Sequence, residues 1–120
     1  MRMQSVVPVL RMFDIARTRE FYLDFLGFRV DWEHQYEPEL PLYLQISLGD
    51  VRLHLSEHYG DGSPGTKAFF NVEGLTQYRE MLLAKQTRFA RPHLVQEPWG
   101  STTMTLHDPS SNRLVFSEAN

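Results

Sequence analysis

The sequence predicts an α+β domain in which one βαβββ unit occurs twice. Two helical patterns of apolar residues lie about 60 residues apart, and in each half one strand precedes the helix and three follow it. Residues 58–66, rich in Gly, Ser and Pro, separate the halves. With 120 residues and 42% apolar content, the chain has room for one core. We therefore expect a single domain over residues 1–120, with module one at about 4–57 and module two at about 67–119.

The first three elements of module one follow from apolar spacing and capping residues. Residues 5–12 are β-branched and apolar, which predicts the first strand. Asp14 is the N-cap candidate of the next helix, and Gly27 is its C-terminal stop. The buried side of that helix is expected to comprise Ile15, Thr18, Phe21, Tyr22, Phe25 and Leu26. Residues 28–33 then alternate as a half-buried strand, and the alternation favours a place in the core for Trp32.

A hairpin around the two-residue turn Gly49-Asp50 completes module one. Its strands cover residues 42–48 and 51–56. Each strand alternates apolar and polar residues, so Leu53 and Leu55 are expected to pack under the helix. The same alternation places His54 on the opposite, open side of the sheet.

Module two repeats this order of elements. We expect a strand over residues 67–72, a helix with Leu75, Tyr78, Met81 and Leu82 on one face, and strands over residues 94–97, 101–107 and 112–118. The turn 108–111 joins the last two strands. Alternation in the first of these strands directs Lys67, Phe69 and Asn71 to the open side and Phe70 toward the helix.

Composition excludes several functional classes. A net charge of −3 with scattered Lys and Arg lacks the concentrated basic footprint of a nucleic-acid-binding protein. The apolar runs are too short to cross a bilayer, and the N-terminus lacks the features of a signal peptide. No cysteine is present, so disulfides and thiolate chemistry are ruled out. We expect a cytoplasmic protein without nucleic-acid or membrane partners.

Several short motifs, in this order and spacing, resemble those of the glyoxalase and bleomycin-resistance proteins, the vicinal-oxygen-chelate superfamily. They are Val6-Val7-Pro8-Val9-Leu10, Phe21-Tyr22, Leu26-Gly27-Phe28, Leu53-His54-Leu55-Ser56-Glu57-His58, Pro98-Trp99-Gly100, Asp108-Pro109 and Asn112-Arg113-Leu114. The resemblance spans nearly the whole chain and is nearest to the bleomycin-resistance branch. It implies paired βαβββ modules whose curved mixed sheets form a groove. Most branches of the family are metal-dependent enzymes, whereas this branch contains homodimers that sequester antibiotics.

The resemblance also implies where a metal site would lie. The four ligand positions of the metal-dependent relatives fall on Val7, His54, Lys67 and Val115. A divalent ion needs three or four convergent donors, and of these four residues only His54 is suited to ligate one. We therefore expect no metal and no other cofactor.

The ligand-binding candidates are Trp99, Phe69, His54, Val9 and Lys67. Trp99 could stack on a flat heteroaromatic ligand at the groove rim, or it could be a packing residue of the hairpin. His54 could hydrogen-bond a ligand, accept a proton or form a displaced metal site with His58. The favoured interpretation is a histidine that is hydrogen-bonded within the groove.

The resemblance, together with the missing metal-ligand set, implies binding without catalysis. The expected ligand is a bleomycin-type antibiotic or a similar planar cationic molecule, held in a groove at a dimer interface. Pro8 cannot donate a ladder hydrogen bond, so its strand should lie at an edge or change partners there. In resembling proteins this proline accompanies exchange of an N-terminal arm between the subunits of a homodimer. The alternatives are a metal-dependent enzyme of the glyoxalase or dioxygenase type, and a binder of an unrelated metabolite.

Overall fold

The computed structural model describes residues 1–85, 89 and 91–120 and contains two four-stranded sheets, each with its own helix. Module one consists of β1 (Val9–Arg11), α1 (Ile15–Arg19), the π-helical segment η1 (Glu20–Phe25), β2 (Arg29–His34), β3 (Tyr43–Leu48) and β4 (Val51–Ser56). Module two consists of β5 (Lys67–Asn71), α2 (Leu75–Ala84), β6 (Val95–Glu97), β7 (Ser101–His107) and β8 (Arg113–Ala119). The predicted βαβββ order occurs twice, which confirms the fold.

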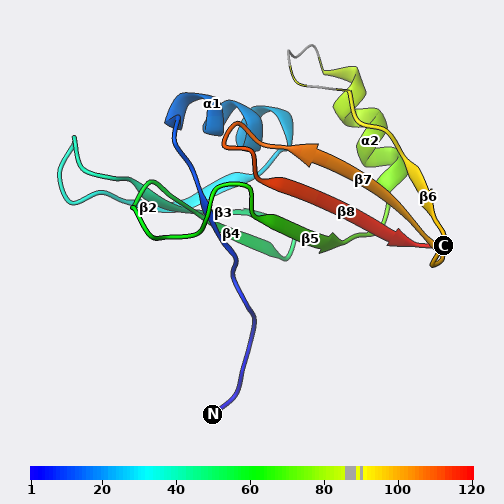
Figure 1. Cartoon of the computed structure of the whole chain (residues 1–120), viewed down its shortest axis with the longest axis horizontal. Coiled ribbons are helices and arrows are strands. Elements are labelled where there is room, and N and C mark those ends of the chain that lie inside the picture. The colour runs from blue at the N-terminus through cyan, green and yellow to red at the C-terminus, as the bar shows by residue number, and fades with distance from the viewer. Residues whose placement is uncertain (86–88, 90) are drawn as a thin grey trace.

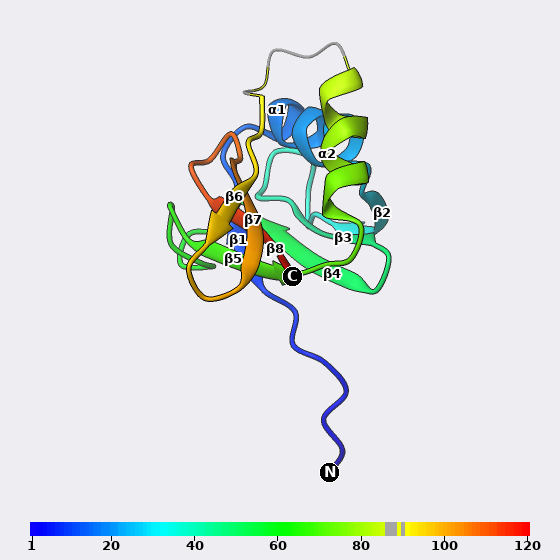
Figure 2. The same cartoon turned by 90° about the vertical axis from the view of Figure 1, so that its right-hand side faces the viewer.

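The two sheets have the same topology. Their strand orders are β1-β4-β3-β2 and β5-β8-β7-β6, and in each the first strand pairs in parallel with the last strand of its module. Both helices lie on the same side of the sheets, and the N-terminal arm, residues 1–8, extends from the other side (Figures 1 and 2). We call the face of each sheet that points away from its helix the open face.

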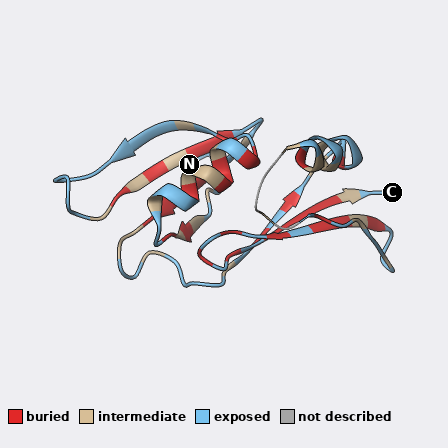
Figure 3. Cartoon of the chain, turned by 90° about the horizontal axis from the view of Figure 1, so that it is seen from above, coloured by how far each residue is buried: buried red, intermediate tan, exposed pale blue. Residues whose placement is uncertain are grey.

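The core lies between each helix and its sheet (Figure 3). Leu53 and Leu55 of β4 are buried, as the alternation predicts. In module two, Phe70 of β5 stacks on Phe116 of β8, with ring centroids 5.0 Å apart and an interplanar angle of 18°. Burial of these large side chains supplies the main stabilisation of each module.

The first helix begins at the expected cap and ends at the expected glycine. The Asp14 carboxylate accepts a hydrogen bond from the Arg17 N–H at 3.0 Å, and Gly27 has a φ of +93°. Its second half is a π-helix, because the Leu26 N–H donates to the Phe21 carbonyl five residues back. A single regular α-helix was expected over this stretch, and that expectation is wrong for η1.

Two further expectations are corrected. The first strand pairs within the chain only at Val9–Arg11 rather than over residues 5–12, because the arm leaves the sheet at Pro8. As Pro8 predicts, this strand lies at the edge of its sheet. In α2, Leu75 and Leu82 are buried but Met81 is 44% exposed. Met81 therefore lies at the margin of the buried stripe and not within it.

The modules are joined by polar contacts of buried or partly buried groups. The Tyr22 hydroxyl donates to Asp108 Oδ2 at 2.6 Å, and the Asn112 amide donates to the Arg11 carbonyl at 2.8 Å. From α2, the Tyr78 hydroxyl donates to the Leu26 carbonyl at 2.6 Å, at the end of the first helix, where carbonyls lack intrahelical partners. Among the described residues, no helix is long and apolar enough to cross a membrane.

Candidate functional site

The open face of module one carries an unbroken row of side chains across its four strands. His54 of β4 is paired with Val9 of β1 on one side and with Gln45 of β3 on the other, and Gln45 is paired with Trp32 of β2. Residues paired in register point to the same face, so these four side chains lie side by side.

Trp32 reaches this row through a β-bulge. The register of β2 against β3 shifts between Val30 and Trp32, so Val30 pairs with Ile46 and Trp32 with Gln45. Regular alternation would have placed Trp32 beside Val30 on the core side. The expectation that Trp32 lies in the core is therefore wrong: its side chain is on the open face and 44% exposed. No residue in the sequence signals the bulge.

Trp32 and Tyr43 form a flat aromatic surface on the open face. Their rings are nearly parallel, with an interplanar angle of 8° and centroids 6.0 Å apart. The edge of His54 meets both rings, with centroids 5.3 Å from Trp32 and 5.1 Å from Tyr43. We call these three residues the aromatic shelf. A partly exposed indole on such a support is suited to stacking with a planar ligand.

A chain of hydrogen bonds fixes the shelf. The Gln45 amide donates to Asp31 Oδ2 at 3.0 Å, and its carbonyl oxygen lies 2.9 Å from His54 Nε2. His54 Nδ1 lies 2.6 Å from the Tyr43 hydroxyl, and the Ser47 hydroxyl donates to Asp31 Oδ1 at 2.9 Å. Because the Gln45 oxygen can only accept, Nε2 of His54 must carry the proton, and Nδ1 of the neutral ring accepts from Tyr43.

The electrostatics agree with this assignment. Partial burial lowers the pKa of His54, which favours the neutral ring. The hydrogen bond from Gln45 is the main cause of the lowered pKa of Asp31. Desolvation opposes it, and the Ser47 hydrogen bond and the charges of Arg29 and Arg52 lower the pKa further. The chain thus runs from an ionised carboxylate to a neutral imidazole that is held at both nitrogens.

The residues at the four positions that the resemblance assigns to metal ligands do not fit a divalent ion. Val7 and Val115 have no donor atom, and Lys67 is a cationic side chain at an exposed position. Both ring nitrogens of His54 already have partners in Tyr43 and Gln45. Among the described residues, no group of three or more His, Asp or Glu side chains could hold a metal ion, so His54 and His58 have no third ligand of these types there.

A polar cavity of about 410 Å³ adjoins the shelf on the open face of module one. It lies between the arm, at Ser5 to Val7, and the sheet, where Asp31, Gln45 and Arg52 contribute to its wall. Three members of the hydrogen-bonded chain, Asp31, Gln45 and Ser47, therefore border space that a small molecule could enter.

The open face of module two carries a second exposed ring. Phe69 is 52% exposed and pairs in register with Val115, whereas the adjacent Phe70 is buried against the helix side. Beside Phe69 lies a row of basic residues: Lys67 of β5 pairs with Arg113 of β8, which pairs with His107 of β7. The sequence predicted Phe69 and Lys67 on this side, and the structure places both there.

Trp99 lies outside the strands that form these two faces. It is 69% exposed in the turn between β6 and β7, where Gly100 has a φ of +93°. None of the ring contacts in the described part of the chain involves Trp99. Of the five predicted ligand contacts, the structure brings Val9 and His54 together on module one and Lys67 and Phe69 together on module two.

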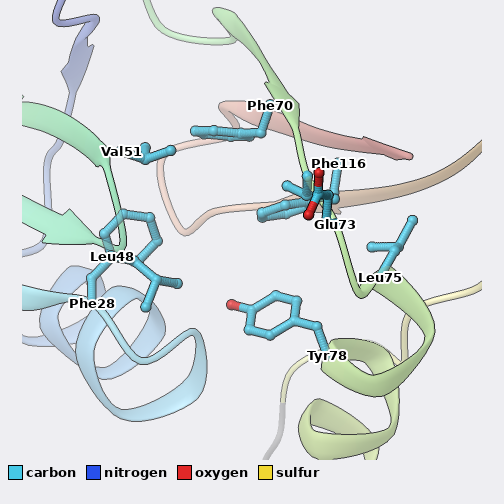
Figure 4. Close-up of a pocket in the computed structure, with 9 residues that line it drawn as sticks. Phe28, Leu48, Val51, Phe70, Glu73, Leu75, Tyr78 and Phe116 are labelled. Atoms are coloured by element: carbon cyan, nitrogen blue, oxygen red, sulfur yellow. The ribbon is translucent and has the colours of Figure 1, made fainter. Parts of the chain in front are cut away.

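A smaller, apolar cavity of about 190 Å³ lies on the helix side between the modules. Figure 4 shows Leu48 and Val51 of the first hairpin on one side of it, and Phe70, Phe116 and Tyr78 of module two on the other. The cavity is separate from the open face and carries no hydrogen-bonded chain of the kind described above.

Comparison with known proteins fixes the family. A family model described as glyoxalase superfamily protein matches residues 1–120. The chain belongs to the glyoxalase superfamily. No curated protein sequence matches it.

Several solved structures share the fold over nearly their full length. The bleomycin-binding protein of Streptomyces verticillus, in complex with copper(II)-bleomycin, is 25% identical, with a TM-score of 0.72 and coverage of 100% of this chain and 99% of that one. The bleomycin resistance determinant encoded on transposon Tn5 is 20% identical, with a TM-score of 0.75 and coverage of 98% and 99%. TnmS3, an antibiotic-binding protein from Streptomyces sp. CB03234, is 14% identical, with a TM-score of 0.70 and coverage of 100% of both chains.

Proposed function

We propose that this protein binds a planar small molecule of the bleomycin type on its open face and sequesters it without catalysis. The aromatic shelf carries this proposal, because it presents an indole that is 44% exposed and held flat against Tyr43. A flat ligand stacked on this indole would remove apolar area from water and gain an offset-stacked aromatic contact. Antibiotic binding by the structurally similar proteins from Streptomyces supports the assignment.

Binding without catalysis agrees with the chemistry of the face. The family's metal positions hold two valines and a lysine, and His54 is occupied at both nitrogens. A histidine held in this way positions the aromatic shelf. We place the protein in the cytoplasm, where a cysteine-free chain of this kind would meet an antibiotic before its target.

Calorimetry tests the proposal directly. The protein is titrated with metal-free bleomycin and with copper(II)-bleomycin, and we expect saturable binding with a Kd in the micromolar range or below. The change Trp32→Ala should weaken binding by about 1–3 kcal/mol, because a stacked aromatic contact is lost. Tyr59→Ala, which removes a ring that is 98% exposed on the connector, should leave the affinity unchanged. Absence of heat with both forms of bleomycin would reject the antibiotic assignment.

Trp99 is a second proposed contact. It is 69% exposed, and at the far end of module two it could close over a ligand that lies along the sheet. Trp99→Ala should then weaken binding by about 1–3 kcal/mol, whereas a role limited to the turn would leave the affinity as it is.

We further propose that the protein is a homodimer in which the N-terminal arms are exchanged. Met1, Met3 and Val6 of the arm are 112%, 83% and 88% exposed, and the arm projects away from its own sheets (Figure 2). A second copy could cover these apolar side chains. Light scattering of the full chain should give twice the monomer mass, and Val6→Asp should shift the protein toward the monomer. A wild-type protein that is monomeric at millimolar concentration would exclude the dimer.

A further inference from the structure

We propose that the open face of module two contains an anion subsite, formed by Lys67, Arg113 and His107, and that the natural ligand carries a carboxylate or similar anionic group beside its planar ring. This inference concerns the same face as the proposed function and rests on it for the identification of a planar ligand.

The register of three adjacent strands creates the row. Lys67 pairs with Arg113 across β5 and β8, and Arg113 pairs with His107 across β8 and β7. The neighbouring positions Ala68, Leu114 and Leu106 are buried on the helix side, so the basic side chains point to the open face. Neighbouring strands are about 4.8 Å apart, which places all three side chains within about 10 Å.

The described residues supply no counter-charge to the row. Lys67, His107 and Arg113 are all exposed, and none has a side-chain hydrogen bond or an ion pair within the part of the chain that the structure describes. Basic residues directly opposite each other weaken a sheet. A bound anion would convert this unfavourable arrangement into charge-assisted hydrogen bonds, which Arg113 can form in a bidentate manner.

The acidic residues on the paired strands of the open face are already engaged. Asp31 accepts from Gln45 and Ser47, and Glu97 accepts from the Thr103 hydroxyl at 2.8 Å. Among the described residues, no acidic side chain forms an ion pair with the basic row beside Phe69. This arrangement does not match the purely cationic ligand expected from the sequence.

Phe69 supplies the second part of the subsite. It lies two residues from Lys67 on the same face of β5, about 7 Å along the strand, and its ring is 52% exposed. An aromatic ring packed on Phe69 would therefore carry a carboxylate attached to it toward Lys67 and Arg113. The class of ligand is an aromatic acid, or a larger planar molecule with an acidic substituent.

Paired probes that differ only in charge test the subsite. The ¹⁵N-labelled full-length protein is titrated with 1-naphthoate and with neutral 1-naphthamide, and amide shifts are followed by NMR. Naphthoate should perturb the amides of β5 and of the first half of β8, and its Kd should be about tenfold lower than that of naphthamide. Sulfate should compete with naphthoate and leave naphthamide binding unaffected.

Matched variants assign the preference to the row. Lys67→Gln with Arg113→Gln should abolish the tenfold preference and leave naphthamide binding as it was. Arg17→Gln, which removes an exposed arginine from the first helix on the other side of the sheet, should retain the preference. Phe69→Ala should weaken the binding of both naphthoate and naphthamide. Equal affinity for the two probes, shifts confined to other surfaces, or a preference that survives the double variant would each overturn the inference.

The two proposals fail in different ways. If bleomycin does not bind but the charge preference for naphthoate is found, the antibiotic assignment falls and the anion subsite stands. If bleomycin or naphthamide binds on the open face and naphthoate binds no more tightly than naphthamide, the planar-ligand proposal stands and the subsite is rejected.

Discussion

The hydroxyl of Tyr22 on the first helix donates a hydrogen bond to Oδ2 of Asp108, at the end of β7, across a distance of 2.6 Å. Tyr22 is fully buried and Asp108 nearly so. The other donors to this carboxylate are the backbone N–H groups of Ser110 and Asn112 and the Asn112 side chain. One buried acid thus shapes the turn before β8 and attaches it to the helix of the other module.

Removal of the Tyr22 hydroxyl should loosen this junction. Tyr22→Phe keeps the ring in the core but leaves Asp108 Oδ2 with the Asn112 amide as its remaining donor. Because hydrogen bonds to charged groups are worth about 1.5–3 kcal/mol, the free energy of unfolding should fall by about that amount. Urea denaturation followed by circular dichroism measures the change. Tyr59→Phe, at a 98% exposed position, is the control, and an equal effect of both substitutions would contradict the role of the junction.

The same contact should make the protein sensitive to alkali. Burial, reinforced by the charge of Asp108 and the hydrogen bond to it, raises the pKa of Tyr22 well above its ordinary value. The unfolded chain loses this proton near pH 10 while the folded chain keeps it, so stability is complete below about pH 10 and falls as the pH rises further. Tyr22→Phe should make the decrease of the free energy of unfolding with pH less steep, by up to about 1.4 kcal/mol per pH unit. If the free energy of unfolding falls with pH equally steeply in wild type and Tyr22→Phe between pH 10 and 12, then Tyr22 ionises alike in the folded and the unfolded chain, and this prediction is wrong.

The hydrogen-bonded chain on the open face predicts the protonation of His54. At pH 7 the ring should be neutral, with the proton on Nε2, and its pKa should lie below the usual 6.5 because of burial. Long-range ¹H–¹⁵N NMR of the ring distinguishes the two tautomers. Tyr43→Phe removes a donor to Nδ1 that stabilises the neutral ring, so it should raise the pKa of His54. A proton on Nδ1 in the wild-type protein would refute the chain as described.

Sequence periodicity predicted most of the fold, because each helix and strand buries one face. The alternation around Leu53 and Leu55, the cap at Asp14 and the stop at Gly27 are local signals, and the structure agrees with each of them. The same alternation located Lys67 and Phe69 on the open side, and strand register then placed Arg113 beside Lys67.

The aromatic shelf could not be predicted in the same way. It depends on a bulge between Val30 and Trp32, and one inserted residue reverses the face of every side chain that follows. Alternation alone therefore assigned Trp32 to the core. The contact of Tyr22 with Asp108 joins residues 86 positions apart, which no local pattern indicates. Sites built from bulges and long-range contacts require the three-dimensional structure.

The connector between the modules offers a test in which two glycines differ in one respect. Gly60 and Gly62 both have positive φ values, +93° and +73°, so alanine is strained at either position. A Cβ at Gly60 would meet no atom within 4 Å, whereas at Gly62 it would lie 2.9 Å from the carbonyl oxygen of Val9 in β1. Gly62 therefore lets the connector approach the edge strand of module one.

Gly60→Ala should lower the free energy of unfolding by about 1 kcal/mol, from backbone strain alone. Gly62→Ala should cost about 1–3 kcal/mol more, because the new methyl group must push the connector away from β1. That displacement would also disturb Val9, which pairs with His54, so amide shifts in β1 and β4 should accompany the loss of stability. Chemical denaturation of the two variants measures the difference, and equal losses would mean that the close approach of Gly62 to Val9 does not exist in solution.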